Sequence, residues 1–521
     1  MKTSCPVVLL PLLCSLVTIA EAQMKLQPTT MKRVAEVSPR YVSYNIEAVE
    51  VTGGRFWKPY GSTAKESQTS GNQPGAMDPS LYEFRPPIDL SNAKLRGLAA
   101  ALGPAYLRVS GTWRNFTYFQ DDDQPASKTP PAGYNGVMTR AEWKGVIDFA
   151  HAVNAELVTS VAVSAGTRDA DGKWTPAEAK KFFDATKRLG GHVAATEFMN
   201  EPTFPDVGGA PKGYTAAMYG EDVKTFTKFM KSEAPDVLYL GPGSVGEGLS
   251  LAPEGTPAAL KIRMLDSHDL MASSGPVYDI FSYHFYPTAS SRCLGSNATK
   301  SDVVLTPAWF ARNITVYDFY AKIRDASIPG KDIWLTETGE AGCGGDPWSS
   351  QFADTFRYVH QLGSLAQRGV KTVMQNTLAA SDYAFLNPQT LDPRPKYWAA
   401  LLWKRTMGTR VLDPGVPATE GLSIYAHCMP NARGGVTLVA LNTSKDAAQT
   451  VSIPVPAERY TITSPALFSS SAMLNGHALT VGDNGSLPEM KAVSVKKGVV
   501  SLAPLSISFL TMPDARNAAC Q

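Results

Sequence analysis

Eight short apolar runs with β-forming residues alternate with amphipathic segments over much of this 521-residue chain. The runs are Tyr41–Val49, Ala105–Val109, Leu157–Val163, Ala194–Phe198, Leu238–Leu240, Ile280–His284, Ile333–Thr336 and Thr372–Gln375. Segments with helical spacing lie between them, at Ala141–Val153, Pro176–Leu189, Gly220–Glu233, Ala308–Ala326 and Gln351–Gln367. This alternation predicts an α/β fold, a (β/α)8 TIM barrel over residues 40–405. A doubly wound sheet is the alternative, but no G-x-G-x-x-G motif follows the early strands.

The pattern changes after Gly408. Short alternating runs separated by Gly, Pro and Asn replace the helical spacing. They are Leu422–Cys428, Val436–Leu441, Thr450–Pro454, Tyr460–Thr463 and Ser501–Leu510. We therefore expect a β-sandwich domain over residues 406–521, to which residues 23–39 contribute.

The first 22 residues have the features of a signal peptide. Lys2 supplies a positive charge, residues 7–19 are mostly apolar, and Ala20-Glu21-Ala22 predicts cleavage before Gln23. The apolar stretch is too short to span a bilayer comfortably. The mature protein is therefore predicted to be secreted or periplasmic, without a membrane anchor.

Charge and composition exclude several classes of function. The net charge is only +2, so we expect no nucleic-acid partner. The seven histidines show no H-E-x-x-H spacing and the cysteines no C-x-x-C motif, so neither a metal nor a cofactor is expected. Removal of the leader leaves Cys293, Cys343, Cys428 and Cys520, which could form two disulfides in any of three pairings.

Two glutamates stand where predicted strands end. Glu201 follows the fourth run, and Glu337 follows the seventh. Active sites of such barrels lie at the carboxyl ends of the strands. Hydrolysis of a glycoside with retention needs two carboxyl groups about 5–5.5 Å apart, and opposed strand ends can supply that spacing. A single glutamate at a strand end is a salt-bridge partner as often as it is a catalytic residue. Two glutamates, at the ends of the fourth and seventh strands, favour a catalytic role for both.

The neighbours of these glutamates suggest separate roles. Asn200 can hold the sugar 2-hydroxyl, so Glu201 is predicted to be the general acid/base, with its pKa raised by the other carboxylate. Glu337 is predicted to stay ionised and act as the nucleophile. Glu197, inside the strand, is expected to pair within the barrel. Glu340 is expected to face solvent or substrate.

The carboxyl end of the sixth predicted strand adds two further candidate site residues. Tyr286 could donate a hydrogen bond to Glu337, and His284 could line the same subsite, although aromatic residues at strand ends commonly only pack. A serine hydrolase is disfavoured, because Ser244 is not in the register of a nucleophile elbow.

Residues 200–202 and 334–338 resemble the acid/base and nucleophile segments of the clan A glycosidase barrels. Residues 105–112, 391–398, 401–404, 407–412 and 517–520 match a narrower group within that clan. These segments are similar to glycoside hydrolase family 79, which includes the heparanases.

This resemblance implies a substrate with β-linked glucuronic acid. It implies that backbone N–H groups of Cys343, Gly344 and Gly345, together with Tyr383, hold the sugar carboxylate. Glu47 matches an acidic residue that can accept hydrogen bonds from sugar hydroxyls.

The resemblance also bears on the cysteines. It implies a Cys428–Cys520 disulfide. Cys343 stands where the family has a glycine, and a cysteine has fewer allowed backbone torsions than a glycine. A disulfide from Cys343 to Cys293 could hold the loop after Glu337 in place.

Departures from the family bear on the substrate. Residues 244–251 contain no Arg or Lys, and residues 121–123 are three consecutive aspartates, where heparanase has basic segments that bind sulfated heparan. We therefore predict an exo-β-glucuronidase that acts by double displacement through a covalent glycosyl-enzyme. An endo-β-glucuronidase of heparanase type and an inactive carbohydrate-binding relative are the alternatives.

Overall fold

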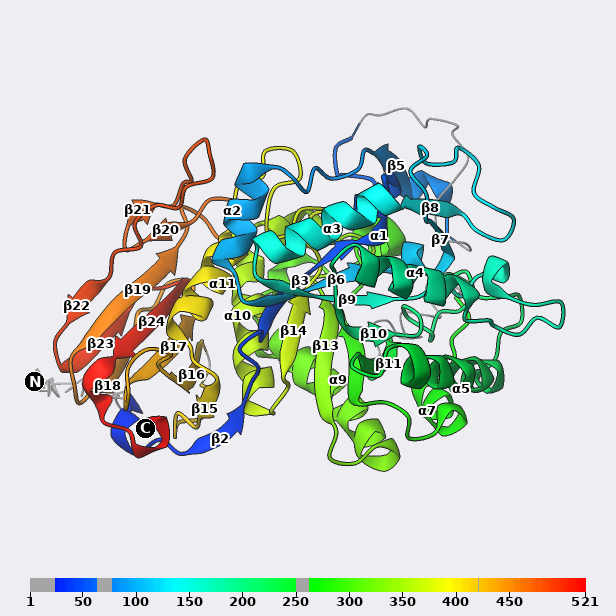
Figure 1. Cartoon of the computed structure of the whole chain (residues 1–521). Coiled ribbons are helices and arrows are strands. Elements are labelled where there is room, and N and C mark those ends of the chain that lie inside the picture. The colour runs from blue at the N-terminus through cyan, green and yellow to red at the C-terminus, as the bar shows by residue number, and fades with distance from the viewer. Residues whose placement is uncertain (1–23, 63–76, 250–261, 420) are drawn as a thin grey trace, which may run out of the picture.

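The computed structural model describes residues 24–62, 77–249, 262–419 and 421–521, and Figure 1 shows it as a barrel with a β-sheet domain beside it. The expected signal peptide, residues 1–22, lies outside the described residues. The sheet domain carries the C-terminus and is built largely from the last part of the chain. Among the described residues, no helix is long and apolar enough to cross a bilayer.

Eight parallel strands among the described residues close into the predicted barrel. They are β3 (Val42–Glu47), β6 (Ala105–Ser110), β9 (Ala155–Ser160), β10 (Val193–Glu197), β11 (Leu238–Ser244), β12 (Ile280–Phe285), β13 (Asp332–Thr338) and β14 (Thr372–Gln375). The barrel closes where β14 pairs with β3, with Val373 opposite Val42. All eight strands coincide with the predicted runs, which confirms the fold class, and their carboxyl ends meet at one mouth.

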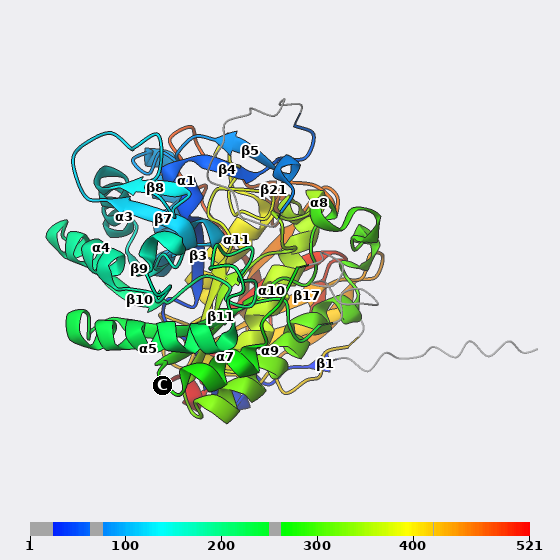
Figure 2. The same cartoon turned by 90° about the vertical axis from the view of Figure 1, so that its right-hand side faces the viewer.

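Helices follow the barrel strands, and the longer ones cover the outside of the barrel. They are α1 (Ala48–Thr52), α2 (Ala93–Ala101), α3 (Arg140–Ala152), α4 (Ala177–Arg188), α5 (Ala216–Glu233), α7 (Ser267–Ser274), α8 (Ser291–Leu294), α9 (Pro307–Ser327), α10 (Phe352–Gln367) and α11 (Pro395–Thr406). Figure 2 shows α5, α7 and α9 side by side on one outer face. Local sequence sets their ends: Thr139 caps the N-terminus of α3, and its side chain accepts a hydrogen bond from the Glu142 backbone N–H in a capping box.

The second domain consists of two sheets. The larger contains β2 (Arg33–Glu36), β15 (Arg410–Leu412), β16 (Leu422–Cys428), β17 (Val436–Asn442), β19 (Ala457–Thr463), β20 (Met473–Leu474), β21 (His477–Ala478), β22 (Val493–Val495) and β24 (Ser506–Met512). The smaller contains β1 (Met24–Lys25), β18 (Gln449–Ile453) and β23 (Gly498–Leu502). The segment before the barrel therefore adds one strand to each sheet, and apolar side chains from both sheets share one core.

Two details of this domain bear on the predictions. Cys428 and Cys520 form a disulfide, as the resemblance implied. The single strand expected at Ser501–Leu510 is wrong, because the chain turns between β23 and β24. Pro504 has no N–H to donate to a sheet, and Leu505 takes a positive φ of 46°.

A small hairpin after the first barrel strand helps to shape the barrel mouth. Its strands, β4 (Gly54–Trp57) and β5 (Tyr82–Arg85), pair antiparallel. The rings of Trp57 and Tyr82 lie 4.7 Å apart, and Phe56 lies 4.9 Å from Trp113, which follows β6. These aromatic contacts hold the hairpin against the loop after β6. A second pair, β7 (Thr117–Gln120) and β8 (Gly136–Thr139), lies in the segment after β6, and its two strands are parallel.

Candidate active site

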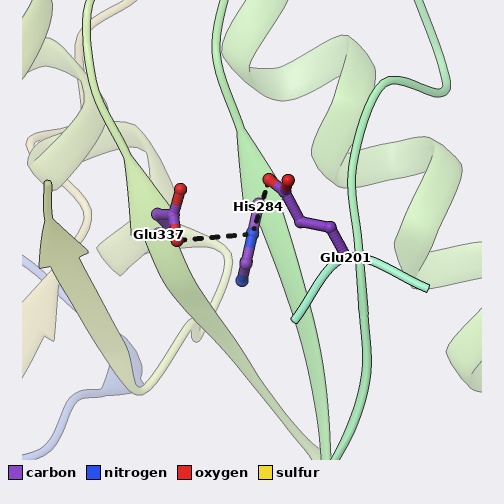
Figure 3. Close-up of side chains that lie close together, drawn as sticks. All are labelled: Glu201, His284 and Glu337. Carbon is purple, nitrogen blue, oxygen red and sulfur yellow. Dashed lines mark hydrogen bonds and ion pairs between the residues drawn. The ribbon is translucent and has the colours of Figure 1, made fainter. Parts of the chain in front are cut away.

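The two candidate glutamates face each other across the mouth of the barrel. Glu337 lies in β13, and Glu201 lies four residues after the end of β10. One carboxylate oxygen of each, together with a ring nitrogen of His284, lie within 4.8 Å of one another (Figure 3). This spacing suits a retaining glycosidase, because an inverting one needs room for a water between carboxyl groups roughly 6.5–9.5 Å apart.

Arg108, on β6, lies at the centre of a buried network beneath these carboxylates. Its Nη1 donates to Glu337 Oε2 at 2.9 Å and its Nη2 to Glu197 Oε2 at 2.8 Å. Nη2 also lies 2.8 Å from Asn200 Oδ1. The arginine side chain is 1% exposed, so these contacts are little screened by water. Glu197 therefore pairs inside the barrel, as expected, and Arg108 holds the nucleophile candidate in place.

The environment of Glu201 differs from that of Glu337. Burial raises the pKa of Glu201 to about 7; Arg108 opposes this rise and Glu197 adds to it. We expected the rise to come from the neighbouring carboxylate, and this cause is wrong, because loss of solvation is the larger effect. A carboxyl group with a pKa near 7 is well suited to general acid/base catalysis.

His284 and Tyr286, from the end of β12, both contact the glutamates. Tyr286 Oη donates to Glu337 Oε1 at 2.7 Å, so the expected contact is present. His284 Nδ1 lies 3.1 Å from Glu201 Oε1 and 3.7 Å from Glu337 Oε2, between the two side chains (Figure 3). Burial lowers the pKa of His284 to about 4, so its ring is neutral near pH 7.

The backbone beside Glu201 is fixed by a side chain that sequence reasoning missed. Asn115 Oδ1 accepts from the Asn200 backbone N–H at 2.8 Å, and Asn115 Nδ2 donates to the Asn200 carbonyl at 2.9 Å. Both asparagines are buried. With Asn200 Oδ1 turned to Arg108, its Nδ2 is directed to Thr112 at the cavity wall.

A second missed residue, Asn376, follows β14 and connects three predicted site residues. Its Nδ2 lies 3.0 Å from Glu47 Oε1, 3.0 Å from Tyr286 Oη and 3.2 Å from Tyr383 Oη. Burial, and next the charge of Glu337, raise the pKa of Glu47 well above its usual range. Glu47, Tyr286 and Tyr383 therefore form one hydrogen-bonded group around the amide.

The predicted carboxylate-binding loop has unusual backbone torsions. Cys343, Gly344 and Gly345 take φ values of 60°, 82° and 83°. Arg292 Nη1 donates to the carbonyls of Cys343 and Gly345, while no described residue accepts a hydrogen bond from the three N–H groups of the loop. Cys343 lines the active-site cavity, and Gly344 lies against Trp57, whose Cβ a side chain at position 344 would meet at 2.7 Å.

Two contacts anchor this loop from outside the cavity. Cys343 is disulfide-bonded to Cys293 of α8, the pairing considered as an alternative from the sequence. Glu340 is fully buried and its Oε2 accepts from the Asp346 backbone N–H at 2.9 Å. The expectation that Glu340 faces solvent is therefore wrong; the carboxyl turns inward to hold the end of the loop.

These side chains surround a cavity of about 150 Å³. Polar side chains come from β13, from the end of β3 and from the residues after β12 and β14. Apolar and aromatic side chains come from the loops after β10 and β11 and from the segments after β3 and β6. None of the described residues that line it is an Arg or Lys. The lining comprises Glu47, Trp57, Met77, Tyr82, Thr112, Trp113, Glu201, Phe204, Val207, Val245, Gly246, Ile262, Tyr286, Thr288, Ala289, Glu337, Gly342, Cys343, Asn376 and Tyr383.

Glu201, His284 and Glu337 are also the one group among the described residues whose ligand atoms could surround a metal ion. Arg108 already places its positive charge 2.9 Å from Glu337 Oε2 and donates toward His284 Nε2. A cation between the glutamates would be repelled by this guanidinium. The donor set therefore suits a pair of carboxylates that work without a metal.

Comparison with known proteins finds heparanases and heparanase-like proteins. Mouse heparanase is 26% identical over 507 residues, covering 85% of this chain and 89% of its own. The baicalin-β-D-glucuronidase of Scutellaria baicalensis is 25% identical, with 82% and 84% covered. Heparanase-like protein 1 of Arabidopsis thaliana is also 25% identical, with 83% and 86% covered. The chain is a homologue of the heparanases.

Solved structures agree with the fold of this heparanase homologue. A 4-O-α-L-rhamnosyl-β-D-glucuronidase from Fusarium oxysporum superposes with a TM-score of 0.62 at 15% identity, covering 94% of this chain and all of that one. A family 51 arabinofuranosidase from Xanthomonas axonopodis pv. citri gives 0.60 at 15% identity, covering 93% and 99%. No protein-family model matches the sequence. The homology supports a glycosidase, and the solved structures support the fold.

Proposed function

We propose that this protein is a retaining exo-β-glucuronidase. The observation that carries the proposal is the pair Glu201 and Glu337, whose carboxylate oxygens lie within 4.8 Å of each other in different environments. Burial raises the pKa of Glu201 to about 7, while Glu337 accepts hydrogen bonds from Arg108 and Tyr286. One group is thus suited to hold a proton and the other to attack.

The reaction follows from these roles in two steps. Glu337 attacks the anomeric carbon as the bond to the leaving oxygen breaks, and Glu201 gives its proton to that oxygen. The product is a glycosyl ester of Glu337 and a free alcohol or phenol. Glu201, now a carboxylate, then takes a proton from water as the water oxygen displaces Glu337. The proton count is restored, and no cofactor is required.

The polar end of the cavity is suited to a sugar that is itself an acid. Cys343 and Tyr383 line that end, and the carbonyls of Cys343 and Gly345 accept hydrogen bonds from Arg292. A carboxylate that accepts such hydrogen bonds is bound more strongly than a neutral hydroxymethyl group. We propose the backbone N–H groups of Cys343, Gly344 and Gly345 as its donors. The names of the Scutellaria and Fusarium proteins, both glucuronidases, support the same sugar.

Charge and shape favour exo action on an unsulfated substrate. The described lining carries no Arg or Lys, so a sulfated chain would find no cation to pair with its sulfates. Trp57, Tyr82 and Trp113 close one side of the cavity, which limits room for further sugars there. An endo-acting heparanase-type enzyme remains the rival. A silent carbohydrate-binding relative is disfavoured, because both glutamates and their partners are in place.

A panel of p-nitrophenyl glycosides tests the proposal. The β-glucuronide should be hydrolysed, and the β-glucoside and β-galactoside, which lack the carboxylate, should be hydrolysed far more slowly. Proton NMR of the first product should show the β-anomer, as retention requires. Glu337→Gln should abolish turnover. Internal cleavage of heparan oligomers without release from aryl glucuronides would support the rival instead.

Location is a separate part of the proposal. We infer export, because two disulfides occur in the described chain and such bonds persist in oxidising compartments. Expression in an exporting host, followed by N-terminal sequencing of the secreted protein, should find Gln23 first.

A further inference from the structure

The lining of the cavity differs from one side to another. Tyr286, Asn376 and Tyr383 lie around Glu337. Trp57, Tyr82 and Trp113 form a separate aromatic wall. The apolar half, formed by the loops after β10 and β11 beside Glu201, is lined by Phe204, Val207, Val245, Gly246 and Ile262. None of these five has a polar side chain. Because Glu201 protonates the leaving oxygen in the proposed reaction, this apolar half lies where the leaving group must sit.

The apolar half is held in place by contacts close to Glu201. The backbone N–H of Phe204 donates to the Glu201 carbonyl at 2.9 Å. Thr203 Oγ1 lies 3.0 Å from the Val245 carbonyl oxygen and 3.1 Å from its backbone nitrogen, which ties the loop after β10 to the end of β11. These bonds position the apolar surface relative to the acid before any ligand arrives.

The ring of Phe204 lies directly against the next loop. A Cβ added to Gly246 would meet Phe204 Cζ at 2.6 Å, so only glycine allows this close packing. Arg263, beside Ile262, forms a paired salt bridge with Asp206 on the outer side of the same loop. The charged groups therefore face outward and leave the inner surface apolar.

We propose that the leaving-group subsite binds a flat apolar aglycone, so that the substrates are glucuronides of aryl alcohols. This inference rests on the proposed function and specifies its substrate class. A sugar in this subsite would lose water from hydroxyl groups for which the five side chains offer no partner, which weakens binding. An aromatic ring loses no hydrogen bond there and can pack against Phe204.

Inhibition constants of uncleavable thioglycosides test the subsite without any chemical step. Phenyl 1-thio-β-D-glucuronide should bind at least about tenfold more tightly than the methyl analogue, which keeps the glucuronate and lacks the ring. Phe204→Ala and Val207→Ser should each reduce this ratio severalfold while leaving methyl binding unchanged. Phe84→Ala is the matched control, because Phe84 is 59% exposed and lies outside the cavity.

The outcomes separate the two proposals. Equal binding of the phenyl and methyl compounds, or tighter binding of a thio-linked glucuronyl-glucosamine disaccharide, would overturn the apolar subsite while the glucuronidase stands. If no glucuronide binds or is hydrolysed, the proposed function itself fails. An equal loss for both ligands in Phe204→Ala and in Val207→Ser would mean that these side chains only support the fold, which also overturns the subsite.

Discussion

His284 Nδ1 lies 3.1 Å from Glu201 Oε1, while Arg108 Nη2 lies 3.3 Å from the other ring nitrogen, Nε2. A guanidinium can only donate, so Nε2 accepts and the neutral ring carries its proton on Nδ1. His284 therefore donates to Oε1 of Glu201. Because Oε1 accepts this bond, we expect the acid proton on Oε2, and Oε2 to be the oxygen that protonates the leaving group.

The pH dependence of the wild type should reflect Glu201. Burial raises its pKa to about 7, and only the protonated form can act as an acid. The kcat/KM for an unactivated glucuronide should therefore fall as pH rises through about 7, approaching tenfold per pH unit above it. His284, with a pKa near 4, cannot cause this fall. A profile measured from pH 4 to 9 that stays flat above pH 7 would contradict the assignment.

Replacement of His284 should shift this fall to higher pH. His284→Ala removes a donor to the Glu201 carboxylate, and loss of a hydrogen bond to the charged form raises a pKa. His284→Asn keeps an N–H near the position of Nδ1 and should retain most of the original profile. His192→Ala, at an exposed histidine paired with Asp236, serves as the control. Equal profiles for all three variants would show that His284 does not tune the acid.

Glu201→Gln should discriminate between leaving groups. Loss of the general acid is expected to reduce kcat by roughly 10²–10⁴ for a poor leaving group such as an alkyl alcohol. A dinitrophenolate needs little protonation, so its release should be affected far less in the first step. Steady-state and burst kinetics on both substrates would measure the difference. A similar loss on both in the first step would assign Glu201 another role.

The sequence predicts the barrel well because each strand and helix is encoded locally. Apolar runs such as Thr372–Gln375 mark the strands, and Glu201 and Glu337 can be found because parallel strands end at a common mouth. The network of Arg108 was harder to predict, since its partners lie 89 and 229 residues away. One signal was present: a charged residue inside the otherwise apolar strand Ala105–Ser110.

Other parts of the site depend on burial, which one sequence does not give directly. Glu340 stands in a glycine-rich loop typical of exposed chain, yet tertiary packing encloses it completely. The pKa of Glu201 was expected to respond to the second carboxylate, but loss of solvation is the larger effect. Asn376 follows an ordinary strand, and only the closed barrel brings its amide to Glu47 and Tyr383.

The Cys293–Cys343 disulfide should matter for substrate binding as well as for stability. The double variant Cys293→Ser with Cys343→Ser removes a bond between residues 50 positions apart in the sequence. Because the unfolded chain then gains conformational freedom, the free energy of unfolding should fall by about 4 kcal/mol. The serine at position 343 must also keep the φ of 60°, so we expect a severalfold higher KM for glucuronides.

Two comparisons isolate the loop effect. Cys293→Ser with Cys343→Gly should recover much of the KM, because glycine adopts a positive φ without strain. Serine variants of Cys428 and Cys520 should lower the unfolding free energy by a similar amount without changing KM, because this bridge lies in the sheet domain. Identical KM values in all variants would show that the loop does not need the bridge.

Gly111 should be required because Glu47 occupies the space beside it. A Cβ at Gly111 would lie 1.4 Å from Glu47 Oε2, and the residue has a φ of 86°. Gly111→Ala must displace the carboxyl group from Asn376, so kcat/KM for glucuronides should fall by about a hundredfold or more. Gly369 has a similar φ of 77°, but nothing lies within 4 Å of a Cβ added there, so Gly369→Ala should cost about 1 kcal/mol of stability without loss of activity.

A double-mutant cycle that combines Gly111→Ala with Glu47→Ala then gives the decisive measurement. Removal of the carboxyl relieves the clash, so the two changes should be strongly non-additive in unfolding free energy. Additive losses would mean that strain at the positive φ, and not Glu47, makes glycine necessary.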